Sequence, residues 1–434
     1  MPEKEKLLKV FKKTAPNGKI TVYLGKRDYI DHLSHVDPID GVVVVEDDYL
    51  KGRKIFGQLM CRFRYGRETD EMMGLQFSKE MILVFNHIQK EQAVKNTPLQ
   101  EKLLRRLGSN AYPFTFEIHP NAPTSVTLQA GDEKYGKPLG VEYELKAWVA
   151  DTKDEKPHRR SSVSMAVRKV QFAPSKQSSR LPSALVSKGF ALSPGKLNLE
   201  VTLDREIFYH GDQVVTNVIV NNNSRKIVKG FKVSVIQHCE VTIVNAQFTR
   251  EIASITTRDG CPITPGASYQ KQFTLIPTAA SINQKKDGVA LDGRLKDEDV
   301  NLASSTLVPD GQNPNSAFGI IVSYSIRVRL NCGSLGGELV ADLPFKLLHP
   351  APGGVPEKAP DRTSKKRDSK PPRRKRSEDA RRILTIRRKQ ALDRIPRQRS
   401  QYAAAESDDD DPTIVFEDFK RMRSVDEPGI EAAK

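Results

Sequence analysis

The stretch VEYELKAWV, residues 141–149, decides the fold class because apolar and polar side chains alternate along it. Val141, Tyr143, Leu145, Ala147 and Val149 would share one face of an extended chain, as in a β-strand with one buried face. The same period of two recurs on both sides, at Ile20, Val22 and Leu24, at Leu59, Cys61, Phe63 and Tyr65, and at Leu197, Leu199, Val201 and Leu203. Turns rich in Gly, Pro, Asn and Asp separate these segments. We therefore predict an all-β protein built from antiparallel β-sandwiches.

The chain of 434 residues is too long for one hydrophobic core, which indicates two folded domains and a tail. The polar stretch APSKQSSRLPS, residues 173–183, interrupts the strand pattern near the midpoint and marks a hinge. We predict an N-terminal sandwich over residues 1–173, a hinge over 174–186 and a C-terminal sandwich over 187–350. A basic and then acidic linker over 351–411 has a composition typical of disorder, and residues 412–434 make up the C-terminal tail.

Positive charge is concentrated in one segment of this linker. The formal net charge is +16, and residues 365–399 alone hold 16 Lys or Arg against four acidic residues. This segment could contact anionic lipid, act as a nuclear signal, bind nucleic acid or serve as a solvated linker. A nucleic-acid or chromatin protein acting through the segment is therefore the alternative function, although we do not expect nucleic acid to be the main partner.

Cysteine usage and the absence of long apolar segments indicate the cellular compartment of the protein. Cys61, Cys239, Cys261 and Cys332 lie far apart without a CxxC pair, which is typical of a reducing environment. The N-terminus MPEKEKLLKVFKK lacks the apolar run of a signal peptide. No stretch approaches the roughly 20 apolar residues that cross a bilayer, so we predict a cytoplasmic protein whose membrane contacts are peripheral.

Enzyme signatures are missing from the sequence. It contains no HExxH, GxSxG, Walker or GxGxxG motif, and its eight histidines show no metal-ligand spacing. We therefore predict no enzymatic activity, no metal and no cofactor.

One amphipathic helix is predicted after residue 97. Thr97 with Gln100 makes a capping box, Pro98 occupies the first helical position, and Gly108 follows the last turn. An apolar stripe runs along the helix at Leu99, Leu103, Leu104 and Leu107. Such a helix could simply cover a sheet, or it could share an apolar groove with another segment.

The segment PTIVFEDFKRMR, residues 412–423, is an apolar island beyond the polar linker. As a strand it would place Ile414 and Phe416 on one face, and as a helix it would align Phe416, Phe419 and Arg423. Both a permanently docked terminal element and a switch segment fit this pattern.

Arg168 is a candidate buried cation. Its neighbours two residues away, Ala166 and Val170, are apolar, and a buried arginine needs carboxylate partners such as Asp28, Asp292 or Asp299. An exposed position on an edge strand is the alternative. Residues 279–306 show no convincing strand pattern, and a loop of this length in a compact domain is typically functional or disordered.

Basic residues near the N-terminus could form one anion-binding surface. Lys12 and Lys13 follow the apolar pair Val10 and Phe11. Phosphate groups favour clusters of Arg and Lys, and the further candidates are Lys26, Arg27, Arg105, Arg106, Arg294 and Lys296.

Nine ordered stretches make the chain resemble the arrestins, of the non-visual, β-arrestin-like kind, over residues 8–350 and 412–423. These stretches are VFKKTAPNGKITVYLGKRDYIDH, RYGRETDEMMGLQF, NAYPFTFEI, VRKVQFAP, IFYHG, LDGRLKDEDVNLASST, GIIVSYSIRVRL, LPFKLLHP and IVFEDFKRMR. The resemblance implies a polar core that consists of Asp28, Arg168, Asp292, Asp299 and Arg421. It implies a latch in which three elements pack together through Val10, Phe11, Leu103, Leu104, Leu107, Ile414, Val415 and Phe416.

The resemblance also implies a function. Such a protein binds activated, phosphorylated G protein-coupled receptors, blocks G protein coupling, and promotes clathrin-mediated internalisation and signalling scaffolding. Receptor phosphates would be bound by Lys12, Lys13, Arg27, Arg106, Arg294 and Lys296. A finger loop would enter the receptor and contains Arg67, Glu68, Asp70, Met72, Met73, Gly74 and Leu75.

Further partners follow from the same resemblance. The released tail would bind the appendage of the clathrin adaptor complex through Phe416, Phe419 and Arg423. An inositol-phosphate or phosphoinositide pocket would contain Lys232, Arg250, Arg327 and Arg329, although Ile236 stands where an arginine is common. The apolar cluster Ile383, Leu384 and Ile386 is followed by basic instead of acidic residues, which argues against direct clathrin binding. The protein would be cytoplasmic, recruited to the plasma membrane, with nuclear entry as an open alternative.

Overall fold

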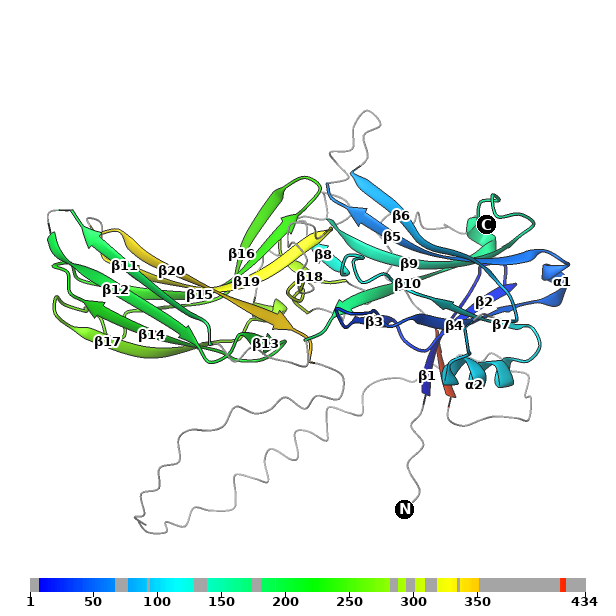
Figure 1. Ribbon diagram of the computed structural model, residues 1–434, viewed down its shortest axis with the longest axis horizontal. Helices are drawn as coiled ribbons and strands as arrows, with labels where there is room; N and C mark the ends of the chain where they lie inside the picture. Colours follow the sequence, from blue (N-terminus) through cyan, green and yellow to red (C-terminus); the bar gives the residue numbers. More distant parts are fainter. Residues whose placement is uncertain are drawn as a thin grey trace, which may run out of the picture. The chain divides into compact units, whose positions relative to one another are not determined.

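The structure is a computed structural model, and it describes residues 8–66, 77–91, 94–128, 139–173, 181–191, 193–281, 288–293, 301–308, 318–333, 336–350 and 414–418. Nearly all of the regular structure in these ranges is β-strand, arranged as two β-sandwiches (Figure 1). The predicted all-β, two-sandwich fold is confirmed.

The N-terminal sandwich pairs a five-stranded sheet with a seven-stranded sheet. The five-stranded sheet has the order β21-β1-β2-β4-β7, and its strands are β21 (Ile414–Asp418), β1 (Leu8–Thr14), β2 (Ile20–Leu24), β4 (Ile39–Val45) and β7 (Ala111–Phe116). The other contains β3 (Asp28–Asp31), β5 (Lys54–Arg64), β6 (Ser78–Ile88), β8 (Val126–Leu128), β9 (Leu139–Ala150), β10 (Ser162–Gln171) and β18 (Ala290–Asp292). Short helical turns accompany them: α1 (Asp47–Leu50) and the 3-10 turn Arg159–Ser161.

The C-terminal sandwich pairs sheets of four and five strands. The four-stranded sheet runs in the order β11-β12-β14-β17, with β11 (Ser183–Phe190), β12 (Ser193–Leu203), β14 (Val214–Asn222) and β17 (Ser268–Leu275). The five-stranded sheet runs in the order β13-β20-β19-β15-β16, with β13 (Ile207–Tyr209), β20 (Glu338–Leu348), β19 (Ile320–Asn331), β15 (Gly230–Val241) and β16 (Ala246–Thr257). A 3-10 turn, Ala279–Ser281, follows β17.

The alternation that predicted strands also determines which side chains form the cores. In β9, Val141, Tyr143, Leu145 and Ala147 are all at most 3 % exposed, whereas Glu142 and Glu144 lie on the opposite face. This is the period expected when one face of a strand packs in a sandwich.

The helix α2 (Pro98–Leu107) lies on β4 and β7, and its start matches the predicted capping box. The Thr97 side chain accepts a hydrogen bond from the Gln100 backbone, and the Gln100 side chain accepts one from the Thr97 backbone. The buried amide of Gln100 also donates to the carbonyl of Phe114, at 2.8 Å. This residue therefore both starts the helix and holds it on the sheet.

Two predictions about the middle of the chain need correction. The sequence shows no strand pattern in residues 279–306, but Ala290–Asp292 form β18, which pairs antiparallel with β8 of the N-terminal sandwich. Three residues are too short for a visible period of two, which is why the pattern did not indicate this strand. The predicted hinge 174–186 is also too long, because β11 begins at Ser183.

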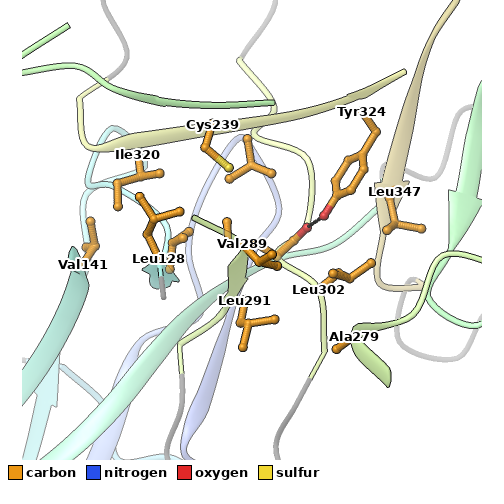
Figure 2. Close-up of a cluster of buried hydrophobic side chains, with 14 of the residues drawn as sticks. Leu128, Val141, Cys239, Ala279, Val289, Leu291, Leu302, Ile320, Tyr324 and Leu347 are labelled. Carbon is orange, nitrogen blue, oxygen red and sulfur yellow. Dashed lines mark hydrogen bonds between the residues drawn. The ribbon is translucent and has the colours of Figure 1, made fainter. Parts of the chain in front are cut away.

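Apolar side chains of both sandwiches meet around β18. Figure 2 shows Leu128 and Val141 from β8 and β9 in one cluster with Cys239, Tyr324 and Leu347 from β15, β19 and β20. Val289 and Leu291 lie among them and are each 1 % exposed. The Tyr324 hydroxyl donates to the carbonyl of Ala303, at 2.5 Å. β18 and the residue before it are therefore held by apolar packing from both sandwiches.

Candidate functional site

The first candidate site is the edge of the five-stranded sheet where β21 joins β1. The two strands run parallel, with Leu8 opposite Ile414 and Val10 opposite Phe416 (Figure 1). They lie more than 400 positions apart in the sequence, so only tertiary contacts bring them together. Residues 414–418 adopt the strand alternative of the two that the sequence allowed, and Ile414 and Phe416 share one face.

A small apolar cluster, separate from the main core, joins three elements at this edge. Its buried members are Val10 on β1, Leu103 on α2, Ile414 on β21, and Val42 and Ala111 beneath the helix. Partly buried side chains complete it: Leu8, Tyr23, Val44, Leu99, Leu104, Leu107 and Phe416. We call this set the latch cluster. It is small enough that a few truncated side chains would change how firmly β21 binds.

Arg106 of α2 contacts β21 in two ways. Its guanidinium donates to the carbonyl of Ile414, at 3.0 Å, and lies 4.7 Å from the centre of the Phe416 ring. The Tyr23 ring meets the same phenyl group edge-on, with centroids 5.3 Å apart. Burial raises the pKa of Tyr23, and the nearby Arg106 opposes this shift. Phe416 is thus enclosed by a cation and an aromatic edge.

Two residues predicted for the latch do not enter the cluster. Phe11 packs against the main core on the other face of β1, with the Lys9 ammonium and the Arg27 guanidinium over its ring. Val415 is 49 % exposed. Alternation explains both corrections, because Phe11 and Val415 each follow a residue that faces the cluster.

The basic residues of β1 divide between the two faces in the same way. Lys12, on the face of Val10, pairs with Asp418 of β21 at 3.8 Å. Lys9 and Lys13 lie on the face of Phe11, where Lys9 forms an ion pair with Glu417 of β21 and Lys13 donates to the carbonyl of Ser164 on β10, at 2.6 Å. Arg27 is buried, being 8 % exposed. Of the six predicted phosphate-binding residues, Arg294 and Lys296 lie outside the described residues.

The second candidate site is the ion pair of Arg168 with Asp28. Arg168 on β10 and Asp28 on β3 are register partners in parallel strands. The guanidinium binds both carboxylate oxygens, through Nε at 2.6 Å and Nη2 at 2.7 Å, and Nη1 donates to the carbonyl of Gly293 at 3.0 Å. The Arg168 side chain is 15 % exposed and β10 lies between β9 and β3, so Arg168 is partly buried and is not on an edge strand. A fork of this kind is the strongest geometry available to an arginine and a carboxylate.

Asp292 does not pair with Arg168, contrary to the predicted polar core. Its carboxylate accepts from the Ser304 backbone at 3.3 Å and lies 2.7 Å from Nε2 of His349. Asp292 ends β18, and the next residue, Gly293, supplies a carbonyl to Arg168 instead of a side chain. The other predicted members, Asp299 and Arg421, lie outside the described residues.

Sequence reasoning missed a cluster of His210, Asp292 and His349. One ligand atom from each residue lies within 4.8 Å of those from the other two, and the two imidazole rings are 4.4 Å apart. Burial lowers the pKa of His210 to about 4, so its ring is neutral near pH 7. The three residues are separated by at least 57 positions, which leaves no spacing for a sequence motif to show.

The predicted inositol-phosphate pocket is divided between two faces of a sheet. Lys232 and Arg329 are register partners on β15 and β19, and Arg327 lies two residues from Arg329 on the same face. Each forms an ion pair with a carboxylate: Lys232 with Glu251, Arg329 with Glu338 and Arg327 with Asp342. Arg250 alternates with Glu251 and points to the other face, where its guanidinium lies close to Gly288. The four residues therefore do not line one pocket.

Several predicted sites cannot be placed. The finger loop residues 67–75 and the adaptor-binding residues Phe419 and Arg423 lie outside the described residues. In the described part of the chain, no helix is long and apolar enough to cross a bilayer.

Comparisons with known proteins agree with this architecture. The profile "Arrestin (or S-antigen), N-terminal domain" matches residues 20–173, and "Arrestin (or S-antigen), C-terminal domain" matches residues 193–352. The chain belongs to the arrestin family. The family likeness extends over nearly the whole chain, because an arrestin homolog from Locusta migratoria is 57 % identical over 97 % of this chain and 97 % of its own length.

Two further relatives bear on the kind of arrestin. Phosrestin-1 of Drosophila melanogaster is 53 % identical over 96 % of this chain and 97 % of its own length. "Arrestin, lateral eye" of Limulus polyphemus is 57 % identical over 80 % of this chain and 85 % of its own length. The arrestin prediction is thus confirmed, whereas the non-visual, β-arrestin-like assignment is not supported by these relatives.

Proposed function

We propose that this arrestin senses receptor phosphorylation by exchanging β21 for a phosphorylated segment of an activated G protein-coupled receptor, and that it then blocks G protein coupling. The observation that supports this most directly is the ion pairing along β1. Lys9 and Lys12, together with Arg106 of α2, hold acidic or backbone groups of β21. An acidic segment of the same chain thus occupies cations that suit a phosphorylated strand.

The docked strand is suited to exchange because its ion pairs with β1 are largely exposed. The Lys12–Asp418 pair has side chains 41 % and 72 % exposed, and exposed pairs contribute about 0–1 kcal/mol. A phosphate group carries about −1.5 to −2 charges and three acceptor oxygens, so it competes well with a single carboxylate. Replacement of β21 by a phosphorylated segment would therefore preserve the strand pairing and strengthen the ion pairs.

Arg168 would act as the second sensor. Its guanidinium binds the carboxylate of Asp28 and the carbonyl of Gly293, which follows β18. A receptor phosphate that drew Arg168 away would release this carbonyl and leave Asp28 without its partner. We propose that Asp299 and Arg421 complete this polar core and that Arg294 and Lys296 help to bind receptor phosphates.

Release of β21 would also expose Phe416. The docked ring lies against Tyr23 and Arg106, so it is not available to another protein in this state. We propose that, once free, Phe416 with Phe419 and Arg423 binds the clathrin adaptor appendage as a helix. Internalisation, with cytoplasmic localisation and recruitment to the plasma membrane, would follow. The name of the Limulus relative makes a light-activated receptor of an eye the first receptor to test.

The deciding experiment compares binding of the full chain to one active receptor prepared with and without phosphates. The matched variant Ile414→Ala with Phe416→Ala weakens the latch cluster without changing any charge. We expect phosphorylation to strengthen binding by the parent chain, and the variant to bind the unphosphorylated receptor more tightly than the parent does. Equal binding of both receptor forms by the parent chain would refute the proposal.

A further inference from the structure

The residues His210, Asp292 and His349 lie where three segments converge. His210 directly follows β13, Asp292 ends β18, and His349 directly follows β20. The two histidines thus lie just after strands of the C-terminal sandwich, whereas β18 pairs with β8 of the N-terminal sandwich. The backbone carbonyl of His349 also accepts a hydrogen bond from the backbone N–H of Ala173, at 2.9 Å.

We propose that these three side chains bind a transition-metal dication of the zinc type. Two imidazole nitrogens and one carboxylate oxygen are a ligand set that Zn²⁺ favours, with a fourth position left for water or a hydroxyl group. Their ligand atoms all lie within 4.8 Å of one another. Because zinc–ligand bonds are about 2.0–2.2 Å long, tetrahedral ligands are about 3.4 Å apart, so small side-chain movements would bring the three to one ion.

The surroundings of the three residues suit metal binding. The carboxylate of Asp292 already lies 2.7 Å from Nε2 of His349, and the Ser304 backbone fixes its other oxygen at 3.3 Å. Nε2 of His210 lies 3.1 Å from the Ser304 hydroxyl, which places an oxygen beside the site as a candidate fourth ligand. The side chains of His349 and Asp292 are only 19 % and 9 % exposed, which reduces competition from water. Metal binding would replace two hydrogen bonds by stronger coordinate bonds.

A metal ion here would have a structural consequence. It would join β18 to the ends of β13 and β20 and so restrain the segment that carries Gly293. The carbonyl of Gly293 is the group that Arg168 binds. This restraint follows from the positions of the ligands and does not depend on the proposed receptor function.

A surface cluster provides a competing site that the experiment must exclude. His32 and His35 stack with ring centroids 4.6 Å apart, and His32 lies 3.0 Å from the carboxylate of Asp37. His238 offers a second control, because its ring contacts the Ser325 hydroxyl at 2.9 Å much as His210 contacts Ser304, but it is not part of the cluster.

The test titrates full-length protein, first stripped with a chelator, with Zn²⁺ by calorimetry and with Co²⁺ by visible absorption. We expect one equivalent of each metal to bind, with the intense d–d bands of tetrahedral Co²⁺. His210→Asn and His349→Gln should each lower the affinity by more than about 100-fold, since loss of a ligand exceeds the 10- to 100-fold effect of an outer partner. His238→Gln, and His32→Gln with His35→Gln, should leave that equivalent unchanged.

A second measurement keeps the proposal testable if a variant folds poorly. In the parent chain, Zn²⁺ should slow hydrogen exchange of the backbone amides of Ala290–Asp292, and a chelator should reverse this. The proposal is overturned if no metal binds, if the bound equivalent is lost in the His32→Gln, His35→Gln variant, or if Zn²⁺ leaves exchange in β18 unchanged.

Discussion

Arg168→Glu tests the proposed charge sensor most directly. The substitution removes the bidentate pair with Asp28, whose bonds are 2.6 and 2.7 Å long, and places a second carboxylate beside it. The free-energy cost lies between two limits: about 3–5 kcal/mol for breaking a buried pair and about 0.2–1 kcal/mol for an exposed one. Arg168 is 15 % exposed and Asp28 is 46 % exposed, so solvent screens the pair in part. We take about 2 kcal/mol, between these limits.

Such a cost shifts the equilibrium between the form with β21 docked and the form with β21 released by about 30-fold, because 1.4 kcal/mol is a factor of ten. The assay measures the affinity of the full chain for active receptor with and without phosphates. We expect the preference for phosphorylated receptor to fall by about that factor, through tighter binding of the unphosphorylated form.

The chain contains a matched control for this variant. Arg327 and Asp342, on β19 and β20, form the same bidentate pair at 2.7 and 3.0 Å, with side chains 24 % and 44 % exposed. Arg327→Glu should leave the phosphate preference unchanged, and Asp28→Arg combined with Arg168→Glu should restore it. A change of less than about threefold in Arg168→Glu, or an equal change in Arg327→Glu, would refute the reasoning.

Three further predictions concern the latch, the tail and the thiols. Leu103→Ala, at a fully buried position, should lower the free energy of unfolding by about 2–5 kcal/mol in urea titrations; a loss under about 1 kcal/mol would contradict the packing. Phe416→Ala should abolish calorimetric binding of a residue 412–423 peptide to the adaptor appendage, with Val415→Ala, at an exposed position, as the control. Burial raises the pKa of Cys61 and Cys239 to about 12, so alkylation at pH 8 should modify the partly exposed Cys261 first, and early loss of either buried thiol would oppose this.

Sequence reasoning did best where the signal is local. The period of two in residues 141–149 predicted β9, and the capping box at Thr97 and Gln100 predicted the start of α2. Strand alternation and helix capping depend on residues within about four positions of one another, so they can be recognised in a single amino-acid sequence. The same locality shows why Ile414 and Phe416 share a face.

The tertiary structure decided which distant groups meet. Alternation alone could not say which face of β1 meets the main core, or that Asp292 binds His349 while Arg168 binds Asp28 and the carbonyl of Gly293. Nor could spacing reveal the cluster of His210, Asp292 and His349, whose members come from three strand ends. Side-chain partners across such separations depend on register and on the packing of two sandwiches. These arise only when the apolar faces are buried together, and no local pattern records them.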